Sequence, residues 1–383
     1  MLFPSPFHLF CVILLCFPLA FVFTITSPSK PEPPIQSTII INTKPKSTIF
    51  SQLNSGKTKN YTSKKLAFLF LAHAPLPFSP LWELYFNNVS KHQYNIYIHA
   101  DPTRNYDPPF SGVFQNRVIP GSIRTRRYSP TLIAAVRRLL THALKDDKSN
   151  SMFALLSPSC IPLHSFNFTY KTLIPSRKSF IEILKNEPGM LDRWMVRGEN
   201  VMLPEVRFED FRVGSQFFVL TRKHAKMVVS DRRLWGKFKM PCLRRDTCYP
   251  EENYFPTLLN MQDPRGCVPA TLTYVDWKGR VDGHPRTYNG SEVGPELIEK
   301  IRGRRPRYGD LTINGSDGFR REILGNHHRY HYPFLFARKF ASESVQRLLS
   351  MASDVIFADD HKSLISSKRE GLNEIIMDVA APA

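Results

Sequence analysis

The chain has 383 residues, with 52 Lys and Arg against 33 Asp and Glu, so its formal net charge at pH 7 is +19. Such an excess of positive charge suits an anionic partner, which here is either a nucleotide diphosphate or an acidic polysaccharide. A nucleic-acid ligand would also explain the charge, but the lumenal features described below exclude it.

The chain opens with an apolar segment. No charged side chain precedes Lys30, and residues 7–25 are apolar except for a histidine, a proline and a threonine. About 20 apolar residues are needed to cross a bilayer. A cleaved signal peptide is the alternative, but no clear small-x-small cleavage motif follows. We therefore predict an uncleaved signal anchor over residues 1–26.

The side of the membrane on which the body lies is indicated by two opposing signals. Lys30, Lys44 and Lys46 follow the anchor, which by the positive-inside rule favours a cytosolic body. Several N-x-Ser/Thr sequons favour a lumenal body instead. The sequons begin at Asn60, Asn88, Asn167, Asn289 and Asn314. Because there are so many of them, we predict a lumenal body.

Cysteine usage agrees with an oxidising compartment. Cys11 and Cys16 belong to the predicted anchor, and the remaining cysteines are disulfide candidates. These are Cys160, Cys242, Cys248 and Cys267. Four cysteines allow three complete pairings, and the sequence does not choose among them. A zinc site is the alternative, but no C-x-x-C pattern supports it.

The rest of the chain divides by composition. Residues 27–63 are rich in Ser, Thr, Pro and Lys and predict a flexible stem. Residues 64–353 predict one large lumenal domain. Residues 354–383 lose clear periodicity and are interpreted as a C-terminal tail.

The first half of the body alternates between strand and helix patterns. Continuous apolar runs, typical of strands buried on both faces, alternate with apolar residues at helical spacing. The predicted strands are 65–71, 94–99 and 152–156, and the predicted helices are 80–89 and 129–144. This alternation predicts an α/β body with a mainly parallel sheet. Ligands then bind beyond the carboxyl ends of the strands, where 99–101 and 157–159 are placed.

The second half is less regular. The predicted strands are 214–220, 271–277 and 334–337, and the predicted helices are 222–230, 251–261, 295–302 and 342–351. The helix at 251 follows Pro250, which suits a helix start, and begins with the acids Glu251 and Glu252. Such a pair is usually a solvated first-turn feature, but one carboxylate at a cleft edge can serve as a general base.

Several of these segments together resemble the core-2/I-branching β-1,6-N-acetylglucosaminyltransferase family, and most closely its plant branch of membrane-anchored glycosyltransferases. The segments occur in family order over most of the body. They are 66–73 (LAFLFLAH), 96–101 (IYIHAD), 153–157 (FALLS), 212–222 (RVGSQFFVLTR), 249–257 (YPEENYFPT) and 334–340 (FLFARKF).

The resemblance implies a GT-A-like fold with a Rossmann-like central sheet, in a type II membrane protein of the Golgi. It implies inverting transfer of a sugar from a UDP-sugar to a glycan or glycoprotein acceptor. Relatives transfer N-acetylglucosamine, xylose or glucuronic acid, and the sequence does not distinguish these donors.

The resemblance assigns the catalytic base to the second acid of its Pro-acid-Glu motif, which is Glu252. An inverting transfer needs one base to take the proton of the acceptor hydroxyl while its oxygen attacks the anomeric carbon. Glu251 is then a helix-start acid or a support.

The departing diphosphate also needs positive charge. No Asp-x-Asp metal motif occurs in the chain, which fits the resembled family, because that family uses basic side chains and no metal. Lys339 carries over as the phosphate-binding lysine, with Arg338 as a neighbouring bidentate donor, and we expect no metal cofactor. A solvated basic pair after a strand is the alternative reading.

A second phosphate-binding arginine of the animal enzymes has no recognisable motif here. The candidates are Arg302, Arg305, Arg307, Arg320 and Arg321. His327, His328 and His331 suggest a metal site, but no carboxylate or cysteine stands near them, so we do not assign one.

The remaining substrate contacts are assigned by position. Asp101 corresponds to the family's nucleotide-side acid, facing ribose or uracil, and a turn-capping aspartate is the alternative. Arg193 with Trp194, Tyr274 and Trp277 are candidate platforms for the acceptor sugar, and buried core aromatics are the alternative.

Other classes of function fit less well. A glycoside hydrolase needs two opposed carboxylates, whereas neighbours on a helix do not face each other. A non-catalytic glycan-binding protein with the same fold is the remaining alternative.

Overall fold

The computed structural model describes residues 63–279, 284–309 and 332–359. The predicted anchor, most of the stem and most of the tail lie outside these residues, as do Asn60, Asn314 and the three clustered histidines. In the described part of the chain, no helix is long and apolar enough to span a bilayer.

The structure is a mixed α/β fold built on two sheets. The strands are β1 (Lys65–Ala72), β2 (Tyr94–Ala100), β3 (Asn150–Leu156), β4 (Ile161–Pro162), β5 (Ser179–Phe180), β6 (Val219–Thr221), β7 (Cys267–Val268), β8 (Thr273–Val275) and β9 (Phe336–Arg338). The larger sheet has the order β2-β1-β3-β6-β5-β7, and the smaller has the order β4-β9-β8.

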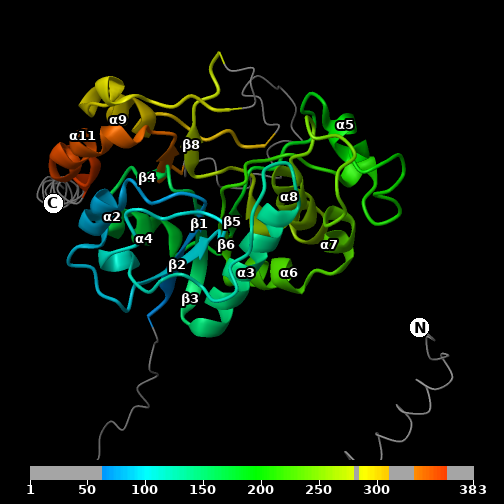
Figure 1. Ribbon diagram of the computed structural model, residues 1–383, viewed down its shortest axis with the longest axis horizontal. Helices are drawn as coiled ribbons and strands as arrows, with labels where there is room; N and C mark the ends of the chain where they lie inside the picture. Colours follow the sequence, from blue (N-terminus) through cyan, green and yellow to red (C-terminus); the bar gives the residue numbers. More distant parts are fainter. Residues whose placement is uncertain (1–62, 280–283, 310–331, 360–383) are drawn as a thin grey trace, which may run out of the picture. The chain divides into compact units, whose positions relative to one another are not determined.

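The helices lie on both sides of the larger sheet (Figure 1). They are α2 (Ser79–Phe86), α3 (Thr131–Asp146), α4 (Phe166–Leu173), α5 (Met190–Met195), α6 (Arg222–Ser230), α7 (Arg233–Phe238), α8 (Pro250–Gln262), α9 (Pro295–Arg302) and α11 (Val345–Ser350). In Figure 1, α2 and α4 lie to one side of the strands, and α3, α6, α7 and α8 lie to the other.

Strand direction agrees only partly with the predicted parallel sheet. β1 pairs in parallel with both β2 and β3, so their carboxyl ends share one edge. β6 runs antiparallel to both of its neighbours, β3 and β5. The sheet is therefore mixed, and its parallel part is the half in which the continuous apolar runs occur.

β1 separates two hydrophobic cores. Alternate side chains of a strand point to opposite faces of its sheet. Phe68 and Phe70 lie in the first core, whereas Leu69 and Leu71 lie in the second with residues of α3, α6 and α8. Because both faces are buried, β1 reads as an unbroken apolar run.

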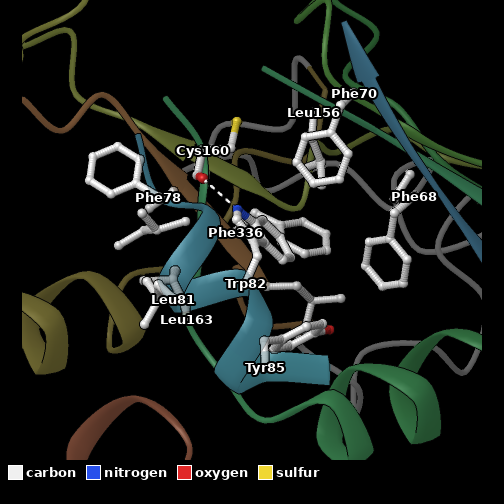
Figure 2. Close-up of a cluster of buried hydrophobic side chains, with 14 of the residues drawn as sticks. Phe68, Phe70, Phe78, Leu81, Trp82, Tyr85, Leu156, Cys160, Leu163 and Phe336 are labelled. Atoms are coloured by element: carbon white, nitrogen blue, oxygen red, sulfur yellow. Dashed lines mark hydrogen bonds between the residues drawn. The ribbon is translucent and has the colours of Figure 1, made fainter. Parts of the chain in front are cut away.

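The first core is dominated by aromatic side chains (Figure 2). Trp82 on α2 is 1% exposed and meets the rings of Phe68 and Phe70 edge-on, at centroid distances of 6.1 and 5.3 Å. Its indole nitrogen donates to the carbonyl oxygen of Cys160 at 3.1 Å. Phe336 of β9 lies against the same indole, at 6.1 Å, so α2 supports both sheets.

The body continues past the predicted boundary at residue 354. A π-helical turn, η7 (Ala352–Ile356), follows α11, and Ile356 is fully buried. Asp359 accepts from the backbone N–H of Ser165 at 2.9 Å and pairs with His164 at 3.0 Å. It also pairs with Arg302. These contacts hold the end of the described chain against α4 and α9.

Candidate active site

The candidate site is built at the carboxyl edge of the parallel strands. His73 follows β1, Asp101 follows β2, and Arg338 ends β9 in the smaller sheet. Desolvation, and then the positive charges of Arg104, Arg338 and Lys339, lower the pKa of His73, while Asp101 raises it. These effects act over short distances, so the structure brings the ends of β1, β2 and β9 together.

The Asp101 carboxylate connects two loops through hydrogen bonds. Its Oδ1 accepts from the backbone N–H and the hydroxyl of Thr103 at 2.9 and 2.7 Å. Its Oδ2 accepts from the same two groups of Thr125 at 2.7 and 2.8 Å. Burial alone would raise the pKa of Asp101, but these hydrogen bonds outweigh it and hold the pKa well below its usual range.

Both oxygens of Asp101 are thus used within the protein, and the side chain is 1% exposed. The carboxylate therefore stabilises the turn after β2. This is the role of a turn-capping aspartate, the alternative given for Asp101 in the sequence analysis. A hydrogen bond from Asp101 to a ribose or uracil would require one of these four hydrogen bonds to break.

Glu252 stands in the first turn of α8. Pro250 occupies the first helical position, where its missing N–H costs nothing. The Glu252 side chain is 30% exposed, and its Oε2 accepts from Nη1 of Arg193 at 2.9 Å. Arg193, on α5, also lies over the ring of Tyr249 at 4.8 Å. The predicted platform residue Arg193 is therefore a partner of the predicted base.

The backbone beside Glu252 is held by a close approach. The N–H of Gly214 donates to the carbonyl oxygen of Glu252 at 2.8 Å. A Cβ at position 214 would lie 2.0 Å from the carbonyl oxygen of Glu182, so no larger residue fits there. This contact fixes the start of α8 against the segment after β5.

Several charges act on the Glu252 carboxyl. Burial raises its pKa, and the positive charges of Arg193, Arg127 and Arg338 oppose that rise. A carboxyl whose pKa is raised toward neutrality is suited to take a proton from a hydroxyl. The charge of Arg338 also acts on this carboxyl, which relates the predicted base to the predicted phosphate-binding pair.

Glu182 is a further carboxyl near Glu252 that the sequence analysis does not single out. Burial raises its pKa to about 7, Arg307 lowers it, and Glu187 and Glu252 raise it. Glu182 lies just after β5, and no local sequence motif marks it. Its place beside Glu252 can be seen only in the folded structure.

Arg338 is a desolvated cation. Its guanidinium lies over the ring of Phe217 at 4.4 Å, and its buried Nε has no hydrogen-bond partner among the described residues. Burial lowers its pKa, while the charge of Glu252 raises it. A buried donor without a partner is costly unless a ligand satisfies it. Lys339 follows directly, and its carbonyl oxygen accepts from the N–H of Tyr288 at 3.0 Å.

The structure describes three of the candidates for a second phosphate-binding arginine, Arg302, Arg305 and Arg307, and two of them have acidic partners. Arg302 pairs with Asp359, and Arg307 pairs with Glu187 at 2.7 Å. Arg320 and Arg321 lie outside the described residues. Arg286 lies over the ring of Tyr288 at 5.2 Å, and the N–H of Tyr288 donates to the carbonyl oxygen of Lys339. Arg286 pairs with Glu292.

The three aromatic platform candidates differ in exposure. Trp194 is 8% exposed and its indole nitrogen donates to the carbonyl oxygen of Val206 at 3.0 Å, which is the buried-core alternative. Tyr274 is 8% exposed and packs edge-on against Phe334 at 5.3 Å, which is the core alternative. Trp277, just beyond β8, is 52% exposed and is open to a ligand. A cavity of about 300 Å³ lies beside Tyr274. Its walls also include Asp276, Lys278, Arg286, Tyr288, Glu292, Leu297, Lys300, Ile301 and Arg304.

The cysteines and sequons are resolved in part. Cys242 and Cys248 form a disulfide directly ahead of α8, whereas Cys160 and Cys267 are buried free thiols. Asn88 and Asn289 are exposed, and Asn167 is half-buried at the start of α4. In the described ranges, no group of three or more His, Cys, Asp or Glu is arranged to hold a metal ion.

Comparison with known proteins identifies the class. A family model described as "Branch: Core-2/I-Branching enzyme" matches residues 66–302. The chain is 31% identical over 318 residues to glycosyltransferase BC10 of Oryza sativa subsp. japonica, an alignment that covers 75% of this chain and 76% of the relative.

A solved structure of an active-site mutant of LgtC covers 71% of this chain and 86% of its own, at 8% identity. Its TM-score is 0.33, which is too low to carry an argument about the fold.

The sequence matches, with the mixed α/β fold, define a protein of the glycosyltransferase class. The chain belongs to the core-2/I-branching enzyme family.

Proposed function

We propose that this protein is an inverting glycosyltransferase that moves a sugar from a UDP-sugar to a glycan or glycoprotein acceptor. The donor sugar belongs to the N-acetylglucosamine, glucuronic acid or xylose class. Glu252 acts as the general base, and Arg338 and Lys339 bind the diphosphate without a metal ion.

The observation that carries the proposal is that Glu252, bound to Arg193 at 2.9 Å, and the buried Arg338, whose Nε has no partner among the described residues, act electrostatically on each other. The charge of each shifts the pKa of the other, although they come from α8 and from the smaller sheet. An inverting transfer needs a base for the acceptor proton and positive charge for the departing diphosphate. The half-buried carboxylate of Glu252 and the desolvated guanidinium of Arg338 are suited to these two roles.

The reaction proceeds in one displacement. The acceptor hydroxyl gives its proton to Glu252 while its oxygen bonds to the anomeric carbon. The bond from that carbon to the diphosphate breaks, and UDP leaves with the electron pair. Arg338 and Lys339 stabilise the charge that develops on the departing oxygen.

The location of the protein follows the same proposal. Residues 1–26 anchor it in the Golgi membrane as a single-pass type II protein with a lumenal catalytic body. The disulfide between Cys242 and Cys248 and the exposed Asn88 and Asn289 support an oxidising, glycosylating compartment.

The test is a donor screen with purified full-length protein in the presence of a chelator. UDP-N-acetylglucosamine, UDP-xylose and UDP-glucuronic acid are offered, and UDP release is measured. We expect slow hydrolysis of one donor, abolished by Glu252→Gln and retained by Glu199→Gln, an exposed carboxyl far from α8 in sequence.

Two results would count against the proposal. Strict dependence on Mn²⁺ contradicts the phosphate-binding role of Arg338 and Lys339. Absence of turnover with every donor contradicts the enzymatic function and leaves the glycan-binding alternative, which glycan-array binding then measures.

A further inference from the structure

Glu251 is a carboxyl beside the proposed base that the reaction above does not use. It is 5% exposed, and its Oε2 is buried with no hydrogen-bond partner among the described residues. Its neighbour Glu252 is half-buried and bound to Arg193 at 2.9 Å. The two adjacent carboxyls therefore occupy different environments, and only one of them has a direct cationic contact.

Titratable groups from several elements act on this pair. Tyr249 directly precedes α8, Arg193 lies on α5, and Arg127 lies just ahead of α3. Arg338 of β9 and Glu182 after β5 act on Glu252.

The cations are not shared equally. Arg193 makes its ion pair with Glu252, while Glu251 receives only longer-range effects from Arg193 and Arg127. Two ionised carboxyls on neighbouring residues repel each other, so the buried member without a partner is the one that holds a proton.

We propose that Glu251 is a positioning residue that stays protonated during turnover and so leaves Glu252 as the anionic carboxyl of the pair. This inference rests on the proposed function only in taking Glu252 as the base. An ionised Glu251 would compete for Arg193 and would add negative charge next to a departing diphosphate. Both effects slow the transfer.

The titration behaviour of the pair agrees with this role. Burial, and then the charge of Glu252, raise the pKa of Glu251 to about 8. Activity should therefore fall on the alkaline side of this value. One pH unit above it, a group of this kind is about nine-tenths ionised, and the rate should be roughly tenfold lower.

The first test compares the pH dependence of kcat/KM for wild type and Glu251→Gln. Glutamine copies the shape of the neutral acid and does not ionise. We expect kcat/KM of Glu251→Gln to show no decrease at alkaline pH. Near pH 7 this variant should remain far more active than Glu252→Gln.

The matched control is Glu296→Gln. Glu296 also follows a proline at the first position of a helix, but it is exposed. This variant should keep the alkaline fall. An alkaline fall that persists in Glu251→Gln overturns the inference, and so does a Glu251→Gln variant as inactive as Glu252→Gln.

A second test needs no substrate and so separates this inference from the proposed function. Infrared difference spectra of wild type and Glu251→Gln at pH 7 should show one protonated-carboxyl stretching band lost in the variant. If no UDP-sugar is consumed but this band is lost, the proposed function fails while the protonated Glu251 stands. If no band is lost, the inference fails regardless of activity.

Discussion

The carboxylate of Glu252 lies 2.9 Å from the guanidinium of Arg193, which in turn lies over the ring of Tyr249 at 4.8 Å. The proposed base is thus held by an ion pair, and the arginine of that pair is itself packed on an aromatic ring next to the start of α8. Each of the following predictions tests one contact of this kind.

Removing Arg193 should raise the pKa of Glu252, because burial then acts with less opposing positive charge. Since the base must be ionised, the acidic limb of kcat/KM should move to higher pH by about one unit or more in Arg193→Met. Activity near pH 7 should fall roughly tenfold. Arg244→Met is the control, because Arg244 forms an exposed ion pair with Asp192 in the same region. An unmoved acidic limb in Arg193→Met would contradict the assignment.

Removing Arg338 should weaken UDP binding. A hydrogen bond to a charged group contributes about 1.5–3 kcal/mol, so Arg338→Ala should lower affinity by roughly 10- to 100-fold. Arg338→Lys should restore little, because an ammonium lacks the planar fork of the guanidinium. Calorimetric titration with UDP in chelator measures both, and the exposed Arg347→Ala serves as control. Equal affinity in wild type and Arg338→Ala would remove Arg338 from the phosphate site.

Replacing Asp101 should destabilise the fold. An Asn amide presents a donor to hydroxyl and N–H groups that now donate to a carboxylate, which should cost about 2–3 kcal/mol at pH 7. The folded-state pKa of Asp101 is lowered, so its contribution is full above its unfolded pKa of about 4 and is lost as pH falls below it. Urea unfolding should show the gap between wild type and Asp101→Asn narrowing only in that acidic range. The exposed Asp354→Asn should show no gap.

The first core should respond strongly to truncation of its central ring. Trp82→Ala should lower the free energy of unfolding by about 3–5 kcal/mol, because it removes a fully buried indole and its hydrogen bond to Cys160. Leu84→Ala is the control, since Leu84 lies on the same helix and is 44% exposed. Chemical denaturation measures both variants. Similar losses in the two would show that α2 is not packed as described.

The sequence predicts the half of the fold in which burial is two-sided. β1, β2 and β3 give long apolar runs because both faces are covered, and α3, α6, α8 and α9 give clear starts and helical spacing. α4, α5 and α7 are short, and β5 and β7 have two residues each, so no periodicity marks them. The sequence predicts a strand over 214–220, but only its last residues belong to β6. The N–H of Gly214 donates to the carbonyl oxygen of Glu252 and not to a neighbouring strand.

The site divides in the same way. Glu252, Arg338 and Lys339 are assigned from the family motif, and in the structure they stand at the start of α8 and at the end of β9. The sequence does not predict the partners of these residues, because Arg193, Glu182 and Tyr288 reach them from distant segments. The capping of Asp101 by Thr125 likewise depends on a loop that folds back across the sheet edge.

β1 has a consequence for the geometry of catalysis. Glu252 is carried by α8, which packs into the second core, whereas Arg338 is carried by β9, which packs into the first. β1 is shared by both cores, with Leu69 facing one and Phe68 facing the other. In the proposed reaction, the strand therefore lies between the element that activates the acceptor and the element that binds the leaving group. We expect a change of side-chain volume on one of its faces to alter the separation of the two charges without touching either of them.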